Sequence, residues 1–221
     1  MQFNTETKTG AGRVDINVRD LTIAGWTGRD AAAVQHHIDE LAAIGVAPPS
    51  QVPLFYRVSA DLLTTAPDIQ VLGEASSGEA EPMLIRAGGK MWIGLGSDHT
   101  DRALEAVSVA SSKQVCAKPC ADGLWDFDLV RDHVDQLQVQ SWIWEGGDWV
   151  LYQDGTLAQV LPVADLANAI DMRDGQAMMC GTFAAIGGVR GATMFKARLH
   201  DPVRRAEIAF SYTAQPLPVV S

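Results

Sequence analysis

Three carboxylates in residues 78–102 (GEAEPMLIRAGGKMWIGLGSDHTDR) have the type and spacing expected of a metal site. Glu79 and Glu81 are separated by one residue, and Asp98 follows on the far side of a glycine pair. Carboxylates held close together repel one another unless a cation lies among them. Hard oxygen ligands without a nearby cysteine favour Mg²⁺, Mn²⁺ or Ca²⁺ over zinc. The sequence therefore indicates a divalent-metal site, and the alternative is the solvated polar end of a hairpin.

A two-residue turn at Gly88-Gly89, between two alternating runs, predicts that these acids share a β-hairpin. If the residues that flank the turn pair with each other, Glu79 lies opposite Asp98 and Glu81 lies opposite Gly96. Directly opposed residues share a face of the sheet, and so do residues two apart in one strand. All three carboxylates are then expected to point into one pocket, which Gly96 would leave uncrowded.

A second group of candidates lies in residues 29–44, where apolar residues repeat with the period of a helix. Asp30 is the expected N-cap and Gly45 the expected stop. His37 and Glu40 are three residues apart and are therefore neighbours on the helix surface. A carboxylate in that position could orient an imidazole that activates water. The adjacent His36 is the alternative histidine, and an ordinary surface His–Glu pair is the alternative interpretation.

The composition is that of an ordinary globular protein and suits one large domain of 221 residues, 47% hydrophobic and 20% charged. A net charge of −10 argues against a nucleic-acid partner, because phosphate binding needs a basic surface. No apolar run is long enough to span a membrane, and the N-terminus lacks the pattern of a signal peptide. We therefore expect a cytoplasmic location and no membrane partner.

The remaining elements are mostly strands. Strand patterns are expected in residues 11–24, 53–72, 195–202 and 206–219, and a second hairpin is expected to turn at Gly146-Gly147. Helices are expected over residues 128–137 and 163–171, with His133 on the surface of the first. All three cysteines are expected to be reduced and buried. The sum is an α+β, β-rich unit with a few helices.

Four local patterns occur in a particular order along the chain: GRDAAAVQHHIDE, GEAE, SDHTDR, and then SKQVCAKP followed by GTFAAIGG. This order resembles the fumarylacetoacetate hydrolase (FAH) superfamily, and in particular a small single-domain bacterial branch of it. The resemblance spans about residues 25–215. It implies an FAH-type fold, a mixed β-sandwich or β-roll with peripheral helices. It also implies one catalytic domain over residues 1–221, with N-terminal strands and a lid helix in about 1–50 and a metal-binding core in about 51–221.

The resemblance assigns roles to individual residues. Glu79, Glu81 and Asp98 match the metal ligands of the superfamily. Lys113 matches the active-site lysine, and His37 with Glu40 matches the water-activating pair. Arg102, Gly181 and Thr182 match substrate-binding positions. The chain departs from the superfamily pattern at Ser97, where an Asn is usual, and at Phe183, where a Pro is usual.

The implied activity is metal-dependent hydrolysis of a carbon–carbon bond in a 2,4-dioxo acid of the acylpyruvate type. Mg²⁺ is the expected cofactor, with Mn²⁺ or Ca²⁺ as alternatives, and a 2-oxo acid is the expected small-molecule partner. The runner-up activities are decarboxylation of an oxaloacetate-type 2-oxo acid and hydration or dehydration of a 2-oxo-3-deoxy acid. A non-catalytic 2-oxo acid binding protein is a further alternative. The resemblance also implies a homodimer.

Overall fold

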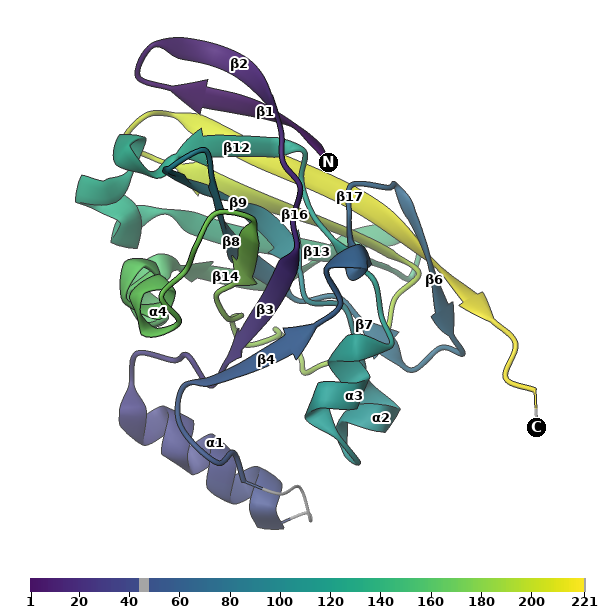
Figure 1. Ribbon diagram of the computed structural model, residues 1–221. Coiled ribbons are helices and arrows are strands. Elements are labelled where there is room, and N and C mark those ends of the chain that lie inside the picture. Colours follow the sequence, from purple (N-terminus) through teal and green to yellow (C-terminus); the bar gives the residue numbers. More distant parts are fainter. Residues whose placement is uncertain (44–47, 221) are drawn as a thin grey trace.

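Two β-sheets packed face to face form the body of the protein in this computed structural model (Figure 1). The structure describes residues 1–43 and 48–220, except for the side chains of His37, Glu40, Leu41 and Ala43. In spatial order, the larger sheet consists of β2 (Gly10–Asp15), β1 (Gln2–Thr7), β12 (Gly123–Asp126), β9 (Lys90–Ser97), β8 (Ala80–Ala87), β15 (Gln176–Met179), β3 (Asp20–Gly25) and β4 (Leu54–Val58). The smaller sheet consists of β14 (Asp148–Thr156), β13 (Gln138–Glu145), β16 (Met194–Asp201), β17 (Ala206–Leu217) and β6 (Asp68–Leu72).

Short strand pairs and helices surround the two sheets. The pairs are β7 (Ser76–Ser77) with β10 (Thr100–Asp101) and β5 (Leu63–Thr64) with β11 (Lys118–Pro119). The helices are α1 (Ala31–Ala43), α2 (Arg102–Glu105), α3 (Val109–Gln114) and α4 (Val163–Ala169). This architecture confirms the prediction of a β-rich fold with a few peripheral helices. Among the residues that the structure describes, none of the helices has the length and apolar character that a membrane crossing would need.

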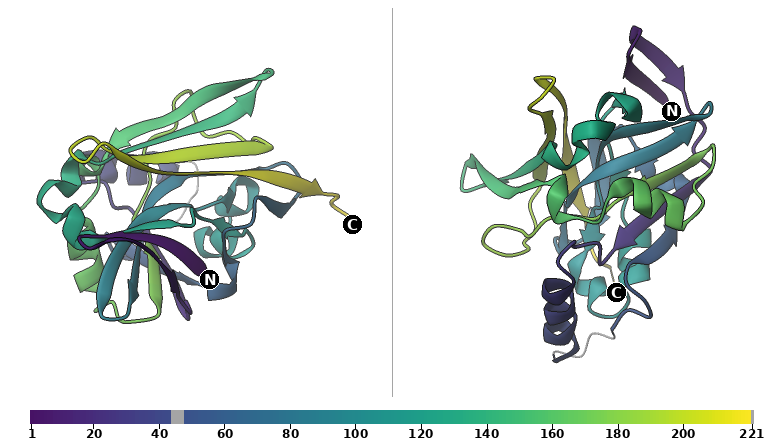
Figure 2. Two further views of the ribbon diagram at one scale, coloured as in Figure 1. Left: turned by 90° about the horizontal axis from the view of Figure 1, so that it is seen from above. Right: turned by 90° about the vertical axis from the view of Figure 1, so that its left-hand side faces the viewer.

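The hydrophobic core lies on both faces of the larger sheet. Leu84 of β8 and Leu95 of β9 face the smaller sheet, where they belong to the same cluster as Leu199 of β16. Met83 and Ile85 point to the opposite face and pack in a second cluster. Figure 2 shows the smaller sheet layered against the larger one. The hairpin of β8 and β9 is therefore central and covered on both sides, so its open end is held in a fixed place.

Both predicted hairpins form with the expected turns. Ala87 pairs with Lys90 across Gly88-Gly89, and both glycines have positive φ, +62° and +73°, as a tight two-residue turn requires. The turn at Gly146-Gly147 joins β13 to β14. The sequence thus predicted the register of the first hairpin and the turn of the second correctly, while a register shift at Ser141/Trp142 interrupts the second.

Helix α1 begins where the sequence predicted. Oδ1 of Asp30 accepts hydrogen bonds from the backbone N–H groups of Ala32 at 2.9 Å and Ala33 at 3.1 Å, so Asp30 is the N-cap. Gly45, the predicted stop, lies outside the described residues. In Figures 1 and 2 the helix lies at the edge of the body, beyond the ends of β3 and β4.

The segment predicted as a helix over residues 128–137 differs from that expectation. It forms two short 3₁₀ helices, Phe127–Leu129 and Arg131–Gln136, with a kink at His133. The His133 side chain is only 12% exposed, so the predicted surface position is wrong. Its Nε2 lies 3.0 Å from both carboxylate oxygens of Asp201, at the end of β16. The three cysteines are free and buried, as predicted.

Asp201 is a fully buried carboxylate that joins the 3₁₀ segment to the turn between β16 and β17. Its Oδ1 also accepts the backbone N–H groups of Val203 at 2.9 Å and Arg204 at 3.1 Å. Burial alone would raise the pKa of Asp201, but the hydrogen bonds from His133 and these N–H groups outweigh it and lower that pKa. A carboxylate with a depressed pKa stabilises the fold above the unfolded-state pKa, near 3.9, and this contribution is lost as the pH falls through the folded-state value.

Replacing Asp201 by Asn is therefore expected to lower the free energy of unfolding at pH 7 by on the order of 1–3 kcal/mol. The difference between variant and wild type should shrink below about pH 4, where Asp201 of the unfolded wild-type chain takes up a proton before that of the folded chain. Urea unfolding at pH 7, 5 and 3.5 measures both effects, with the exposed Asp154→Asn as a control that should change little. A constant difference at all three pH values would show that the charge of Asp201 does not stabilise the fold.

Candidate metal centre

The open end of the β8–β9 hairpin gathers the three candidate carboxylates. Glu81 pairs with Gly96 in the register, Glu79 directly precedes β8, and Asp98 directly follows β9. The pairing continues beyond the strands, because the N–H of Asp98 donates to the carbonyl oxygen of Glu79 at 2.9 Å. One oxygen of each carboxylate lies within 4.8 Å of an oxygen of the other two. The cluster thus lies where the hairpin register predicted it.

Gly96, which was predicted to leave space beside the carboxylates, makes room for a neighbouring side chain instead. A Cβ atom at this position would lie 2.7 Å from Cε of Met179 in β15. The glycine therefore admits the Met179 side chain, and it does not leave open space in a pocket.

Two lysines from the segment that follows the hairpin hold Asp98, which is fully buried. Lys113, in α3, donates a hydrogen bond to Oδ2 of Asp98. Nζ of Lys118, in β11, lies 3.0 Å from Oδ1 and donates to the carbonyl oxygen of His99 at 2.5 Å. The structure thus brings the predicted Lys113 to the cluster and adds Lys118, which sequence reasoning missed. A lysine within the apolar segment VCAKPCA was the available signal, because a buried lysine needs a charged partner.

The guanidinium group of Arg102, which was predicted to bind substrate, contacts three protein side chains. Nε donates to Oγ of Ser77 at 2.7 Å, and Nη1 donates to Oε2 of Glu105 at 2.9 Å. Nη2 lies 3.1 Å from Oε1 of Glu79. This geometry makes Arg102 a group that positions Glu79, while its contact with substrate remains a prediction.

The loop after β15 closes over the second glutamate. The N–H of Gly181 donates to Oε2 of Glu81 at 2.8 Å. Gly181 has a φ of +103°, and a Cβ there would lie 1.7 Å from Oγ1 of the buried Thr27. Only glycine fits at this position. Thr182 donates from Oγ1 to the carbonyl oxygen of Ala80 at 3.1 Å, so both predicted loop residues lie beside the cluster.

Gln153 of β14 ties this loop to the hairpin, and sequence reasoning missed it. Its Nε2 donates to Oγ1 of Thr182 at 2.7 Å and to the carbonyl oxygen of Phe183 at 2.9 Å. Its Oε1 accepts the N–H of Ala80 at 2.8 Å. A polar residue among the alternating apolar residues of a strand gave no indication of these distant partners.

The pKa values of the three acids are shifted in different directions. Burial raises the pKa of Glu81 well above its usual range, and the neighbouring Asp98 raises it further. Burial also raises the pKa of Glu79, although Arg102 and Lys113 oppose this effect. For Asp98, burial is outweighed by Lys113 and Lys118, which lower its pKa to about 2. The two glutamates are therefore costly to hold as anions when no cation lies among them.

This donor set fits a hard divalent cation. All three candidate ligands are carboxylates, which Mg²⁺, Mn²⁺ and Ca²⁺ prefer. Oδ1 of Asp98 is buried, and among the described residues it forms an ion pair with Lys118 at 3.0 Å. Glu79, Glu81 and Asp98 could therefore hold one such ion, which would remove the repulsion between them.

The predicted water-activating pair is only partly described. His37 and Glu40 belong to α1, but their side chains lie outside the described part of the structure. Their catalytic role stays a prediction, and so does the choice between His36 and His37.

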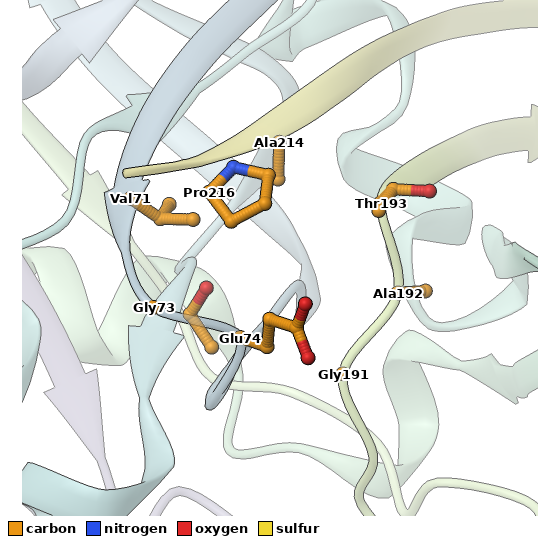
Figure 3. A pocket seen from close by; sticks show the side chains of 9 residues that line it. Val71, Gly73, Glu74, Gly191, Ala192, Thr193, Ala214 and Pro216 are labelled. Carbon is orange, nitrogen blue, oxygen red and sulfur yellow. The ribbon is translucent and has the colours of Figure 1, made fainter. Parts of the chain in front are cut away.

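Two pockets lie near the cluster. The first, of about 200 Å³, lies between β4 and the segment that joins α2 to α3, with Trp26 and Tyr56 in its wall. The second, of about 300 Å³, has Val71, Ala214 and Pro216 on one side and residues 191–193 on the other, with Glu74 between them (Figure 3). None of the three carboxylates lines either pocket.

Residues 24–212 match the family model described as "Protein of unknown function (DUF2848)". The chain belongs to the DUF2848 family. No curated protein matches the sequence of this DUF2848 protein.

Solved structures similar to this DUF2848 protein are FAH-superfamily enzymes. The crystal structure of Cg1458 with inhibitor has a TM-score of 0.69 at 12% identity, covering 95% of this chain and 81% of that chain. 2-Keto-3-deoxy-D-arabinonate dehydratase complexed with magnesium and 2,5-dioxopentanoate has a TM-score of 0.66 at 12% identity, covering 92% and 75%. Maleylpyruvate hydrolase from Sphingobium sp. SYK-6 has a TM-score of 0.53 at 15% identity, covering 86% and 84%. The predicted FAH-type fold is confirmed.

Saturating Mg²⁺ is expected to raise the thermal midpoint of the wild type by about 5–10 °C, because a ligand at 100 times its Kd stabilises the folded state by about 2.7 kcal/mol. Glu81→Gln should abolish this shift and should raise the midpoint in EDTA, because it removes one of three mutually repelling acids. Differential scanning fluorimetry with and without Mg²⁺ measures both effects.

The matched control is Glu74→Gln, which changes an exposed glutamate outside the cluster. It should keep the Mg²⁺-dependent shift. Equal shifts in wild type and Glu81→Gln would contradict a metal site at the hairpin.

Proposed function

We propose that this protein is a metal-dependent hydrolase that cleaves a carbon–carbon bond in a 2,4-dioxo acid of the acylpyruvate type. The observation that carries the proposal is the group of three carboxylates at the hairpin end, within 4.8 Å of one another, with Lys113 on Asp98. Buried acids in this arrangement favour a hard cation and, through it, an anionic oxygen ligand. The FAH-type fold supports the same class of enzyme.

A divalent cation bound to Glu79, Glu81 and Asp98 would supply Lewis-acid chemistry and a fixed point for the substrate's carboxylate and 2-oxo oxygen. Lys113 would stay protonated, because Asp98, Glu79 and Glu81 raise its pKa against the effect of burial. Its ammonium group would therefore stabilise the negative charge that develops on the pyruvate fragment as it leaves. Gly181 and Arg102 would keep Glu81 and Glu79 in place.

The helix α1 would supply the base. Glu40 would orient His37, and the imidazole would take a proton from water as the water oxygen attacks the C4 carbonyl. The bond between C3 and C4 then breaks, C4 becomes the carboxylic acid product, and C3 takes up a proton to give pyruvate. One water molecule is consumed in each turnover.

Dehydration of a 2-oxo-3-deoxy acid is the second candidate function. It is favoured by the fold similarity to 2-keto-3-deoxy-D-arabinonate dehydratase complexed with magnesium and 2,5-dioxopentanoate. All three reactions would use the same carboxylate cluster. Hydrolysis also needs an attacking water, whereas decarboxylation does not. The products therefore separate the three reactions.

The test incubates the purified protein and Mg²⁺ or Mn²⁺ with acylpyruvates, oxaloacetate and 2-oxo-3-deoxy sugar acids, and identifies products by mass spectrometry. We expect pyruvate and a carboxylic acid from acylpyruvates, with one oxygen of the acid derived from ¹⁸O-labelled water. His37→Ala should lower kcat by about 10²–10⁴-fold, the usual contribution of a general base.

His36→Ala is the matched control and should retain activity, because only one of the two adjacent histidines is assigned as the base. Loss of activity in His36→Ala alone would move the role to that residue. Formation of carbon dioxide or of a dehydrated acid, with acylpyruvates left intact, would overturn the hydrolase proposal.

A further inference from the structure

The pocket of about 200 Å³ beside the candidate metal centre carries an inference about the substrate. Two of its lining residues, Tyr56 and Glu105, contact cations that are themselves paired with the carboxylates. The Tyr56 ring lies with its centroid 5.8 Å from Nζ of Lys113. Glu105 accepts a hydrogen bond from Arg102, which in turn lies 3.1 Å from Glu79. A molecule whose one end lies at the carboxylates could therefore extend into this pocket.

The pocket wall is mainly apolar. Its described lining includes Trp26, Leu54, Tyr56, Val107 and Val109, and Glu105 is the single charged residue in that lining. Arg102 contacts three protein groups, and Lys113 lies on Asp98 at the end of the site assigned to the pyruvate fragment, away from the distal group. Among the described residues of the pocket lining, a second carboxylate on the substrate would thus meet Glu105 and no cation. Val107, at 81% exposure, is an apolar side chain that a bound ligand could cover.

The backbone is strained at Trp26, in the aromatic part of the pocket wall. Trp26 has a φ of +60°, a left-handed conformation that bulky residues rarely adopt. Its indole N–H donates to the Tyr56 hydroxyl at 3.2 Å, and the next residue, Thr27, packs against Gly181 of the loop that holds Glu81. Residues kept in such conformations cluster at functional sites. The two rings are therefore fixed relative to the carboxylates.

We propose that this pocket receives the distal acyl group of the substrate and selects 2,4-dioxo acids whose acyl group is uncharged and apolar, up to the size of a phenyl ring. The proposal rests on the function proposed above and names its substrate class. A cavity of about 150 Å³ is enough to hold benzene, so the pocket volume suits such a group. Dicarboxylic 2-oxo acids are disfavoured because of Glu105.

The test uses three 2-oxo acids that lack a second ketone and share the 2-oxo carboxylate end: pyruvate, 2-oxo-4-phenylbutanoate and 2-oxoglutarate. Isothermal titration calorimetry with saturating Mg²⁺ gives their Kd values. We expect the phenyl compound to bind about tenfold or more tightly than pyruvate, because its ring leaves water. 2-Oxoglutarate should bind no more tightly than pyruvate.

The variant Val107→Lys places a cation at the pocket wall without disturbing the core, because Val107 is largely exposed. It should weaken binding of 2-oxo-4-phenylbutanoate and tighten binding of 2-oxoglutarate, each by several-fold. The matched control Val203→Lys changes an exposed valine in the turn between β16 and β17 and should leave all three affinities unchanged. Thermal midpoints verify that both variants fold.

The outcomes separate the two proposals. If the three acids bind equally well, or if 2-oxoglutarate binds most tightly, the inference about the pocket is wrong while the metal-dependent function stands. The same holds if Val107→Lys leaves the ranking unchanged, since the distal group would then lie elsewhere. If none of the acids binds in the presence of Mg²⁺, the proposed function and the inference fall together.

Discussion

Repulsion between three largely buried acids is the constraint on which the rest of the site depends. The hairpin of β8 and β9 is covered on both faces, so Glu81 and Asp98 are buried and Glu79 is nearly so. Lys113, Lys118 and Arg102 offset the repulsion only in part, and the glutamate pKa values stay raised by burial. Without a cation between them, these acids would destabilise the fold by their mutual repulsion. Their burial side by side is the physical argument for a cation.

Each neighbouring element contributes one contact to this arrangement. The segment after the hairpin returns across its open end and supplies Arg102 and both lysines. The loop after β15 supplies the N–H of Gly181, and β14 of the smaller sheet supplies Gln153. The two sheets thus meet at the cluster, and the carboxylates are fixed by hydrogen bonds as well as by packing. Sites built on rigid elements in this way are positioned before a ligand arrives.

The DUF2848 protein shares its fold with FAH-superfamily enzymes at 12–15% identity. At such low sequence identity, proteins with the same fold can have different functions, so function has to be argued from the side chains at the site. Here two kinds of side chain lie near the cluster: charged groups surround the carboxylates, and the Tyr56 ring of the mainly apolar pocket lies beside Lys113. This division is what a substrate with an anionic head and an apolar tail would need.

The sequence by itself determined the local geometry. Gly88-Gly89 set the hairpin register, and that register placed Glu79, Glu81 and Asp98 together, because side chains alternate strictly along a strand. Asp30 likewise set the start of α1. Only the tertiary structure decided which distant groups meet these residues: Lys118 at Asp98, Gln153 at the loop, Met179 at Gly96, Asp201 at His133, and β1 against β12, where Asn4 pairs with Gly123. Backbone geometry fixes contacts a few residues apart, whereas burial and charge pairing depend on segments that meet only when the whole chain has folded.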